Sequence, residues 1–200
     1  SSPFGIHKSD LRDWPLIGAK WVRLWDTGDT WNVYELERGR FRWEKLDAKI
    51  AAAQRNDVKV LYVFAYTPTW ASARPEEGHY TGAGATAEPR KINDWRNFVR
   101  EVARRYKGRI AAYEVWNEPN AGFFSGTVEA YERLLEAAYE VLKQEDPAAR
   151  VLGLSATGSY FEWMEQAFKL GALKHMDVVS VHTYTTPRSP EEVNLVGRYE

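Results

Sequence analysis

The chain contains no cysteine among its 200 residues, which excludes disulfide bonds, thiolate metal sites and cysteine nucleophiles. It also lacks an excess of either charge, because 27 basic residues balance 28 acidic ones and neither sign forms a long run. Such a balance gives no electrostatic footprint for nucleic acid or for an anionic membrane. We therefore expect neither nucleic acid nor a membrane as a partner.

Long hydrophobic runs are absent too, and none approaches the length of a membrane span. The first five residues have no signal-peptide character, although a processed signal would leave the same start. A secreted or periplasmic location is slightly favoured over a cytoplasmic one. The 4 histidines show no metal-ligand spacing on a helix, so we expect no metal and no cofactor.

Aromatic residues, in contrast, are abundant, with 9 Trp, 11 Tyr and 8 Phe. Some of these rings are needed for a core, which a hydrophobic content of 44% supports in a chain of this length. Others fall at expected strand ends, where flat rings can line a cleft against which sugars stack. Residues 1–200 are interpreted as a single domain.

Short apolar runs alternate with segments of helical period, which is typical of a parallel α/β sheet. The expected strands are Phe4–His7, Lys20–Trp25, Val58–Tyr66, Ile110–Trp116, Val151–Ser155 and Val178–His182. The expected helices begin near Trp43, Asn93, Thr127 and Tyr160, and the first crossover, Asp10–Ile17, is poorly defined. The segment Ser189–Leu195 resembles the opening of one more helix, inside which the chain ends.

The alternation allows an open, doubly wound sheet or a barrel. An open nucleotide-binding sheet carries a glycine-rich turn after its first strand, whereas the turn here, His7–Asp10, contains no glycine. A (β/α)8 barrel typically needs about 250 residues. We therefore predict a TIM barrel that is truncated in this chain to about six β/α units.

The segment Trp116–Asn120 reads Trp-Asn-Glu-Pro-Asn and closes one of the apolar runs. It places the carboxyl group of Glu118 where a strand ends, beside the amide of Asn117 and the indole of Trp116. Acid catalysis on a sugar needs a proton donor, a neighbour that orients a hydroxyl, and apolar surroundings that raise the donor's pKa. Glu118 is therefore the candidate catalytic residue, although an acid that merely begins a helix would look similar.

This segment resembles the fourth-strand signature of the retaining glycoside hydrolases built on (β/α)8 barrels. The residues Trp21–Trp25 and Val181–Tyr184 resemble the second and sixth strands of that clan. The residues Tyr66–Ser72 are similar to the third-strand end in glycoside hydrolase family 39, the β-xylosidase and α-L-iduronidase group. The resemblance covers nearly the whole chain, and its fourth-strand motif is the specific part.

The resemblance implies that Glu118 is the general acid/base and that Asn117 bonds the sugar 2-hydroxyl. It implies that Arg23 lies beneath the catalytic centre and holds the nucleophilic carboxylate ionised, while Tyr184 donates a hydrogen bond to that carboxylate. His182 borders the nucleophile and is expected to contact substrate.

Three further candidates for substrate contact are His7, Trp70 and Trp116, and the first two have structural alternatives. A core role is favoured for His7, and Trp70 is as consistent with loop packing as with a sugar platform. Arg23 could also form a purely structural ion pair.

The resemblance also implies a nucleophilic Glu on a seventh strand, which this chain does not contain. We therefore predict that the chain alone cannot complete double displacement, and we expect a complementary segment with strands seven and eight, or self-association. The leading interpretation is the acid/base-bearing part of a retaining glycosidase that acts on a β-linked poly- or oligosaccharide. The alternatives are a non-catalytic carbohydrate-binding barrel and an engineered or split fragment that is inactive until complemented.

Overall fold

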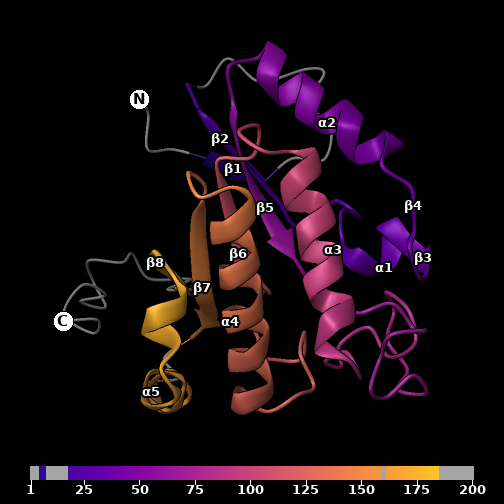
Figure 1. The fold of residues 1–200 in the computed structure, drawn as a ribbon. Coiled ribbons are helices and arrows are strands. Elements are labelled where there is room, and N and C mark those ends of the chain that lie inside the picture. Colours follow the sequence, from indigo (N-terminus) through magenta and orange to yellow (C-terminus); the bar gives the residue numbers. More distant parts are fainter. Residues whose placement is uncertain (1–4, 8–17, 159–160, 185–200) are drawn as a thin grey trace.

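The computed structural model describes residues 5–7, 18–158 and 161–184 (Figure 1). Its first half contains β1 (Gly5–His7), β2 (Trp21–Leu24), α1 (Trp31–Tyr34), β3 (Glu35–Glu37), β4 (Arg40–Phe41), α2 (Glu44–Arg55) and β5 (Lys59–Phe64). Its second half contains α3 (Ile92–Arg105), β6 (Ala112–Val115), α4 (Val128–Glu145), β7 (Arg150–Thr157), α5 (Phe161–Leu170), the short 3-10 helix η1 (Ala172–His175) and β8 (Val178–His182).

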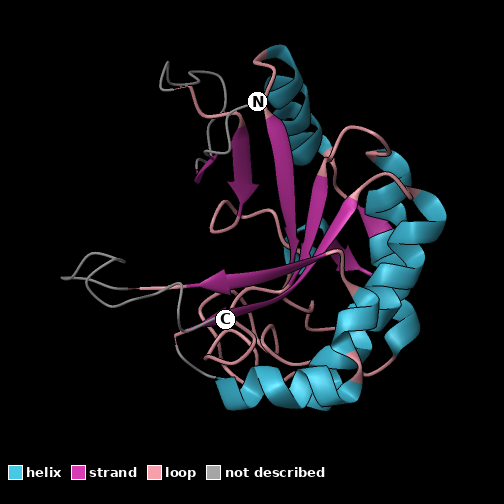
Figure 2. Ribbon diagram, turned by 90° about the vertical axis from the view of Figure 1, so that its left-hand side faces the viewer, coloured by secondary structure: helices cyan, strands magenta, loops and turns pink. Residues whose placement is uncertain are grey.

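Six strands form one sheet in the order β1-β2-β5-β6-β7-β8, and each neighbouring pair is parallel. The sheet is curled, and the long helices lie along one of its sides (Figure 2). Consecutive parallel strands joined by helices are the units of a (β/α)8 barrel. The expected fold class is confirmed: the described residues form six consecutive parallel strands of a truncated TIM-barrel-like fold.

The helices form where apolar residues recur on one face. On α4 the stripe that faces the sheet is fully or almost fully buried; it comprises Val128, Tyr131, Leu134, Leu135, Ala138 and Leu142. Thr127 caps this helix, because its hydroxyl accepts a hydrogen bond from the backbone N–H of Ala130. The expected helix starts at Trp43 and Asn93 agree with the observed starts to within one residue.

An antiparallel pair, β3 and β4, lies between β2 and α2 and has no counterpart in the sequence-based prediction. Its strands are only 3 and 2 residues long, which is too short for a period of two to be recognised. The expected crossover Asp10–Ile17 and the expected helix at Ser189–Leu195 lie outside the described residues.

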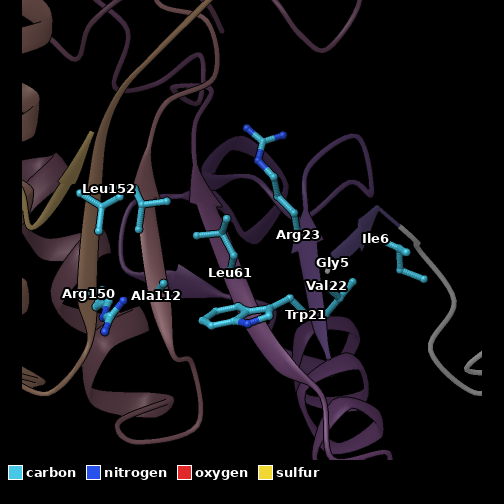
Figure 3. A pocket seen from close by; sticks show the side chains of 10 residues that line it. Gly5, Ile6, Trp21, Val22, Arg23, Leu61, Ala112, Arg150 and Leu152 are labelled. Atoms are coloured by element: carbon cyan, nitrogen blue, oxygen red, sulfur yellow. The ribbon is translucent and has the colours of Figure 1, made fainter. Parts of the chain in front are cut away.

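The sheet face opposite the helices divides into two ends. At the amino ends of the strands, apolar side chains, including Trp21, Leu61 and Leu152, line a cavity of about 490 Å³ (Figure 3). At the carboxyl ends the same face carries charged and polar groups. Within the described part of the chain, no helix is long and apolar enough to cross a membrane.

Candidate active site

The carboxyl ends of the central strands have an unusual backbone. Positive φ angles occur at Tyr66 after β5, at Trp116 and Glu118 after β6, and at Leu154 and Ser155 within β7. Residues other than glycine rarely adopt this conformation, and such residues cluster at functional sites. These strand ends therefore hold side chains in directions that a regular strand would not give.

Glu118 lies at the centre of this region and is 9% exposed. Its Oε1 atom accepts a hydrogen bond from the Tyr184 hydroxyl at 3.1 Å and lies 2.9 Å from Nδ1 of His182. Residues from β6 and from the end of β8 are thus brought together, as the sequence led us to expect. The contact differs in one respect, because Tyr184 was expected to bond a nucleophile and here bonds Glu118.

Asn117 is oriented by Arg23. Nη2 of Arg23 donates to Oδ1 of Asn117 at 2.8 Å, so the amide oxygen points toward β2. The NH2 group of Asn117, a donor of two hydrogen bonds, is consequently presented away from Arg23. This is the orientation in which the amide can donate to a substrate hydroxyl.

Sequence reasoning missed Glu114, whose side chain is 1% exposed. Nε of Arg23 donates to its Oε2 atom at 2.6 Å, and the hydroxyls of Ser155 and Ser180 donate to its Oε1 atom at 2.6 and 2.8 Å. The expected carboxylate partner of Arg23 was a nucleophile, whereas among the described residues the partner is Glu114. A signal was available, because Glu114 and Arg23 both interrupt apolar strands, and buried charges need partners.

The charges of this cluster support one another. Burial alone would raise the pKa of Glu114, but His182, Arg23 and the Ser155 hydroxyl stabilise the carboxylate and hold its pKa at about 2. In turn, the Glu114 carboxylate raises the pKa of His182, with a smaller contribution from Glu118, although burial opposes this. The pKa of His182, which lies beside two carboxyl groups, is therefore above the ordinary value for histidine.

An irregularity in β7 places Ser155 in the cluster. The register between β7 and β8 shifts between Leu154 and Ala156, as in a β-bulge. The hydroxyl of Tyr131 stabilises this bend, since it accepts from the N–H of Leu154 at 2.7 Å and donates to the carbonyl of Val115 at 3.1 Å. The buried face of α4 thus connects the ends of β6 and β7.

Two of the expected aromatic contacts have packing roles. The Trp116 indole is fully buried, and its N–H donates to the carbonyl of Phe123 at 2.8 Å. It presents no surface to a ligand, so the expectation of substrate contact is corrected. The Trp70 indole donates to the carbonyl of Glu35 and carries the guanidinium of Arg38 over its ring at 5.0 Å, which agrees with loop packing.

His7 belongs to β1, but its side chain lies outside the described part of the structure.

Other rings border the site. The Arg23 guanidinium lies over the Trp25 ring, whose centroid is 5.3 Å from that of Tyr66. The Tyr66 hydroxyl is 3.4 Å from that of Tyr80, a side chain that is 78% exposed. Aromatic surface thus extends from the buried charges to solvent. Among the described residues, no three His, Cys, Asp or Glu side chains are grouped as a metal ion would require.

Comparison with known proteins gives a consistent result. The family model described as "Glycosyl hydrolases family 39" matches residues 19–193. A β-xylosidase from Caldicellulosiruptor saccharolyticus is 29% identical over 118 residues, which is 54% of this chain and 24% of that protein.

Solved structures share the fold. A GH39 β-xylosidase from Caulobacter crescentus superposes with a TM-score of 0.72 at 23% identity, over 98% of this chain and 47% of that one. A family 39 glycoside hydrolase from Bacteroides cellulosilyticus gives a TM-score of 0.68 at 22% identity, over 86% of this chain and 34% of that one. The chain therefore spans less than half the length of these relatives.

Proposed function

Because this chain belongs to glycosyl hydrolases family 39, we propose that its carboxyl-end site acts in the hydrolysis of a glycoside, with Glu118 as the general acid/base. The observation that carries the proposal is the contact of Glu118 with both His182 and Tyr184 at the end of β6. An acid that only began a helix would not need two partners from another strand.

The contacts assign different tasks to the two oxygens of Glu118. His182 and Tyr184 both approach Oε1, which leaves Oε2 for the glycosidic oxygen of the substrate. Glu118 first donates a proton to the leaving oxygen and then removes one from the attacking water. Burial and the bond to Glu118 raise the pKa of Tyr184, so its hydroxyl remains a donor through both steps.

Asn117 takes the second role in the proposal. Its amide NH2 donates to the sugar hydroxyl next to the anomeric carbon, and such a contact strengthens as the oxocarbenium-like transition state forms. Arg23 supports this orientation by its bond to Oδ1. The exposed ring of Tyr80 is available for a sugar that extends beyond the buried charges.

A β-xyloside is the first substrate to test, since two of the relatives described above are β-xylosidases. Double displacement requires a second carboxyl group about 5–5.5 Å from the first. Glu114 is not available as that nucleophile, because it is enclosed and its two oxygens are held by Arg23, Ser155 and Ser180.

We therefore propose that residues outside this chain supply the nucleophile, from a complementary segment that carries strands seven and eight. Self-association that covers the open face is the alternative. The interior of a closed barrel is filled by layers of side chains from all of its strands. The cavity at the amino ends of the six described strands therefore supports either arrangement, because further side chains could fill it.

The test compares hydrolysis of an aryl β-xyloside with hydrolysis of an unactivated xylo-oligosaccharide by the chain alone and by the chain with added residues that complete the barrel. We expect turnover in the completed form only. Glu118→Gln should lower kcat for the unactivated substrate by about 10²–10⁴-fold and affect the aryl xyloside less, because an activated leaving group needs little protonation.

Glu132→Gln is the matched control. Glu132 also contacts a histidine at 2.9 Å, but on α4, away from the site. Equal activity of Glu118→Gln and Glu132→Gln would overturn the assignment of Glu118. Substrate binding that survives in every variant without turnover would instead favour a non-catalytic carbohydrate binder.

A further inference from the structure

Glu114 is the most enclosed charged group of the site, and the reaction proposed above does not use it directly. Its carboxylate is contacted from three other strands, by Arg23 of β2, Ser155 of β7, and Ser180 of β8. His182, also on β8, lies 3.8 Å away through its Nε2 atom. No other side chain described here links so many strands at the carboxyl ends.

A buried ion pair is not in itself a stabilising feature. Taking two charges out of water has a large desolvation cost, and well-packed apolar residues often stabilise a protein equally well or better. The strand accepts a buried apolar residue on the same face, since Ala112, two positions before Glu114, is buried. The placement of the carboxylate is therefore better explained by the groups that it holds than by stability.

The first of these groups is Arg23. Its Nε bonds Glu114 and its Nη2 bonds Asn117, so the planar guanidinium bridges the two side chains. A guanidinium has a fixed fork of donors, and fixing one edge fixes the other. The charge of Glu114 thereby determines which way the Asn117 amide faces.

The second group is His182. Its ring lies between the two carboxyl groups, with Nδ1 2.9 Å from Glu118 and Nε2 3.8 Å from Glu114. A negative charge on the Nε2 side favours a proton on the ring and thus a donor toward Glu118. The titratable and charged groups that face this ring are Glu114, Glu118 and Arg23, as far as the described residues extend.

We propose that Glu114 is a positioning residue, whose carboxylate fixes the Asn117 amide through Arg23 and the Glu118 carboxyl group through His182. The inference rests on the proposed function for its catalytic consequence. The linked contacts themselves are independent of that function.

The experiment uses Glu114→Gln, which keeps the shape of the side chain and removes its charge. In the form of the protein that hydrolyses the xyloside, we expect kcat to fall about 10–100-fold, because loss of positioning of reacting groups has effects of this size. KM should change much less, and the pH profile of kcat should shift as His182 loses its neighbouring charge. NMR titration of the 200-residue chain should give a lower pKa for His182 in the variant.

A matched control separates positioning from stability. Glu35 is also buried and bonded, to the Trp31 indole and the Gly39 N–H, but on the β3–β4 pair. Glu35→Gln should lower stability but leave the pH profile of kcat and the pKa of His182 unchanged. Arg23→Lys provides a second route if Glu114→Gln does not fold, since lysine keeps the charge and lacks the fork. Arg23→Lys should lower kcat, whereas the pKa of His182 should remain raised.

The proposal is overturned if kcat, the pH profile and the His182 titration of Glu114→Gln all match those of the unaltered protein. It is also overturned if the effects of Glu114→Gln and Arg23→Lys on kcat simply multiply in the double variant, because residues that act as one unit are not additive. An unaltered activity of Glu118→Gln would instead contradict the proposed function, while the NMR titration would still report on Glu114.

Discussion

The inner face of the sheet carries different side chains at the amino ends of its strands than at their carboxyl ends. At the amino ends, β2, β5 and β7 contribute Trp21, Leu61 and Leu152 to a mostly apolar cavity, which Arg150 and Arg23 also border. At the carboxyl ends, β2 and β6 contribute Arg23 and Glu114 to a network of buried charges.

The backbone differs in the same way. Of the seven described non-glycine residues with positive φ, four lie just after the carboxyl end of a strand, namely Asp26, Tyr66, Trp116 and Glu118. Leu154 and Ser155 lie at the bend within β7, and Asp57 alone precedes a strand. The amino ends thus carry mainly apolar side chains, whereas the carboxyl ends use backbone strain and fixed charge to orient reactive groups. This division is the one known for (β/α)8 barrels.

The largest effect that would test this comparison is on stability. Glu114→Ala should lower the free energy of unfolding by about 3–5 kcal/mol, because it leaves Arg23 without its partner in a buried site. Leu61→Ala should cost about 1 kcal/mol, since its side chain already borders a cavity and little new void is created. Urea denaturation measures both, and similar costs for the two variants would contradict the difference between the ends.

The next effect concerns pH. The pKa of Glu114 is about 2 in the folded chain against an ordinary value of 4.5. Because the folded pKa is the lower one, its contribution is complete above the unfolded pKa and is lost as the pH falls through the folded pKa. As the pH falls from about 5 to about 2, protonation of Glu114 should lower the free energy of unfolding by about 3 kcal/mol.

His182 has the opposite sign: its pKa is raised, so its contribution is present at low pH and lost as the pH rises through the folded pKa. Urea denaturation over a pH series should show a shallower acid loss in Glu114→Gln than in the unaltered chain. Identical acid slopes would show that Glu114 is not the group responsible.

The smallest effect concerns two buried tyrosines, Tyr131 on α4 and Tyr62 on β5. Tyr131→Phe should cost about 1–3 kcal/mol, because it leaves the Leu154 N–H and the Val115 carbonyl buried without a partner. Tyr62→Phe is the control, since the buried Tyr62 hydroxyl has no hydrogen-bond partner among the described residues. Thermal unfolding should leave this control unchanged or slightly more stable, and an equal loss in both variants would refute the role given to Tyr131.

Much of the fold could be predicted because its signals are local. The stripe of α4 and the cap at Thr127 depend on residues close together in the chain, and both were confirmed. The hairpin of β3 and β4 could not be predicted, since its short strands are held by contacts such as that of Trp70 with Glu35.

For the site, the segment Trp116–Asn120 indicated the position of Glu118 and Asn117, and the family match supports the class of chemistry. The same motif led us to expect substrate contact from Trp116, whose indole instead packs in the core. A conspicuous residue beside a catalytic candidate can belong to the core. Glu114, four positions before Glu118, was not identified from the sequence, because it lies within a run of mostly apolar residues.

The sequence by itself determined the alternation of strands and helices, and it determined that a carboxyl group ends the strand β6. Those properties follow from periodicity and from neighbours in the chain. Only the tertiary structure decided which charges meet: Arg23 and Glu114 are 91 positions apart, and Ser180 lies 66 positions beyond Glu114. Parallel register and the bend in β7 bring these groups together, and the low polarity of the buried site makes their pairing decisive.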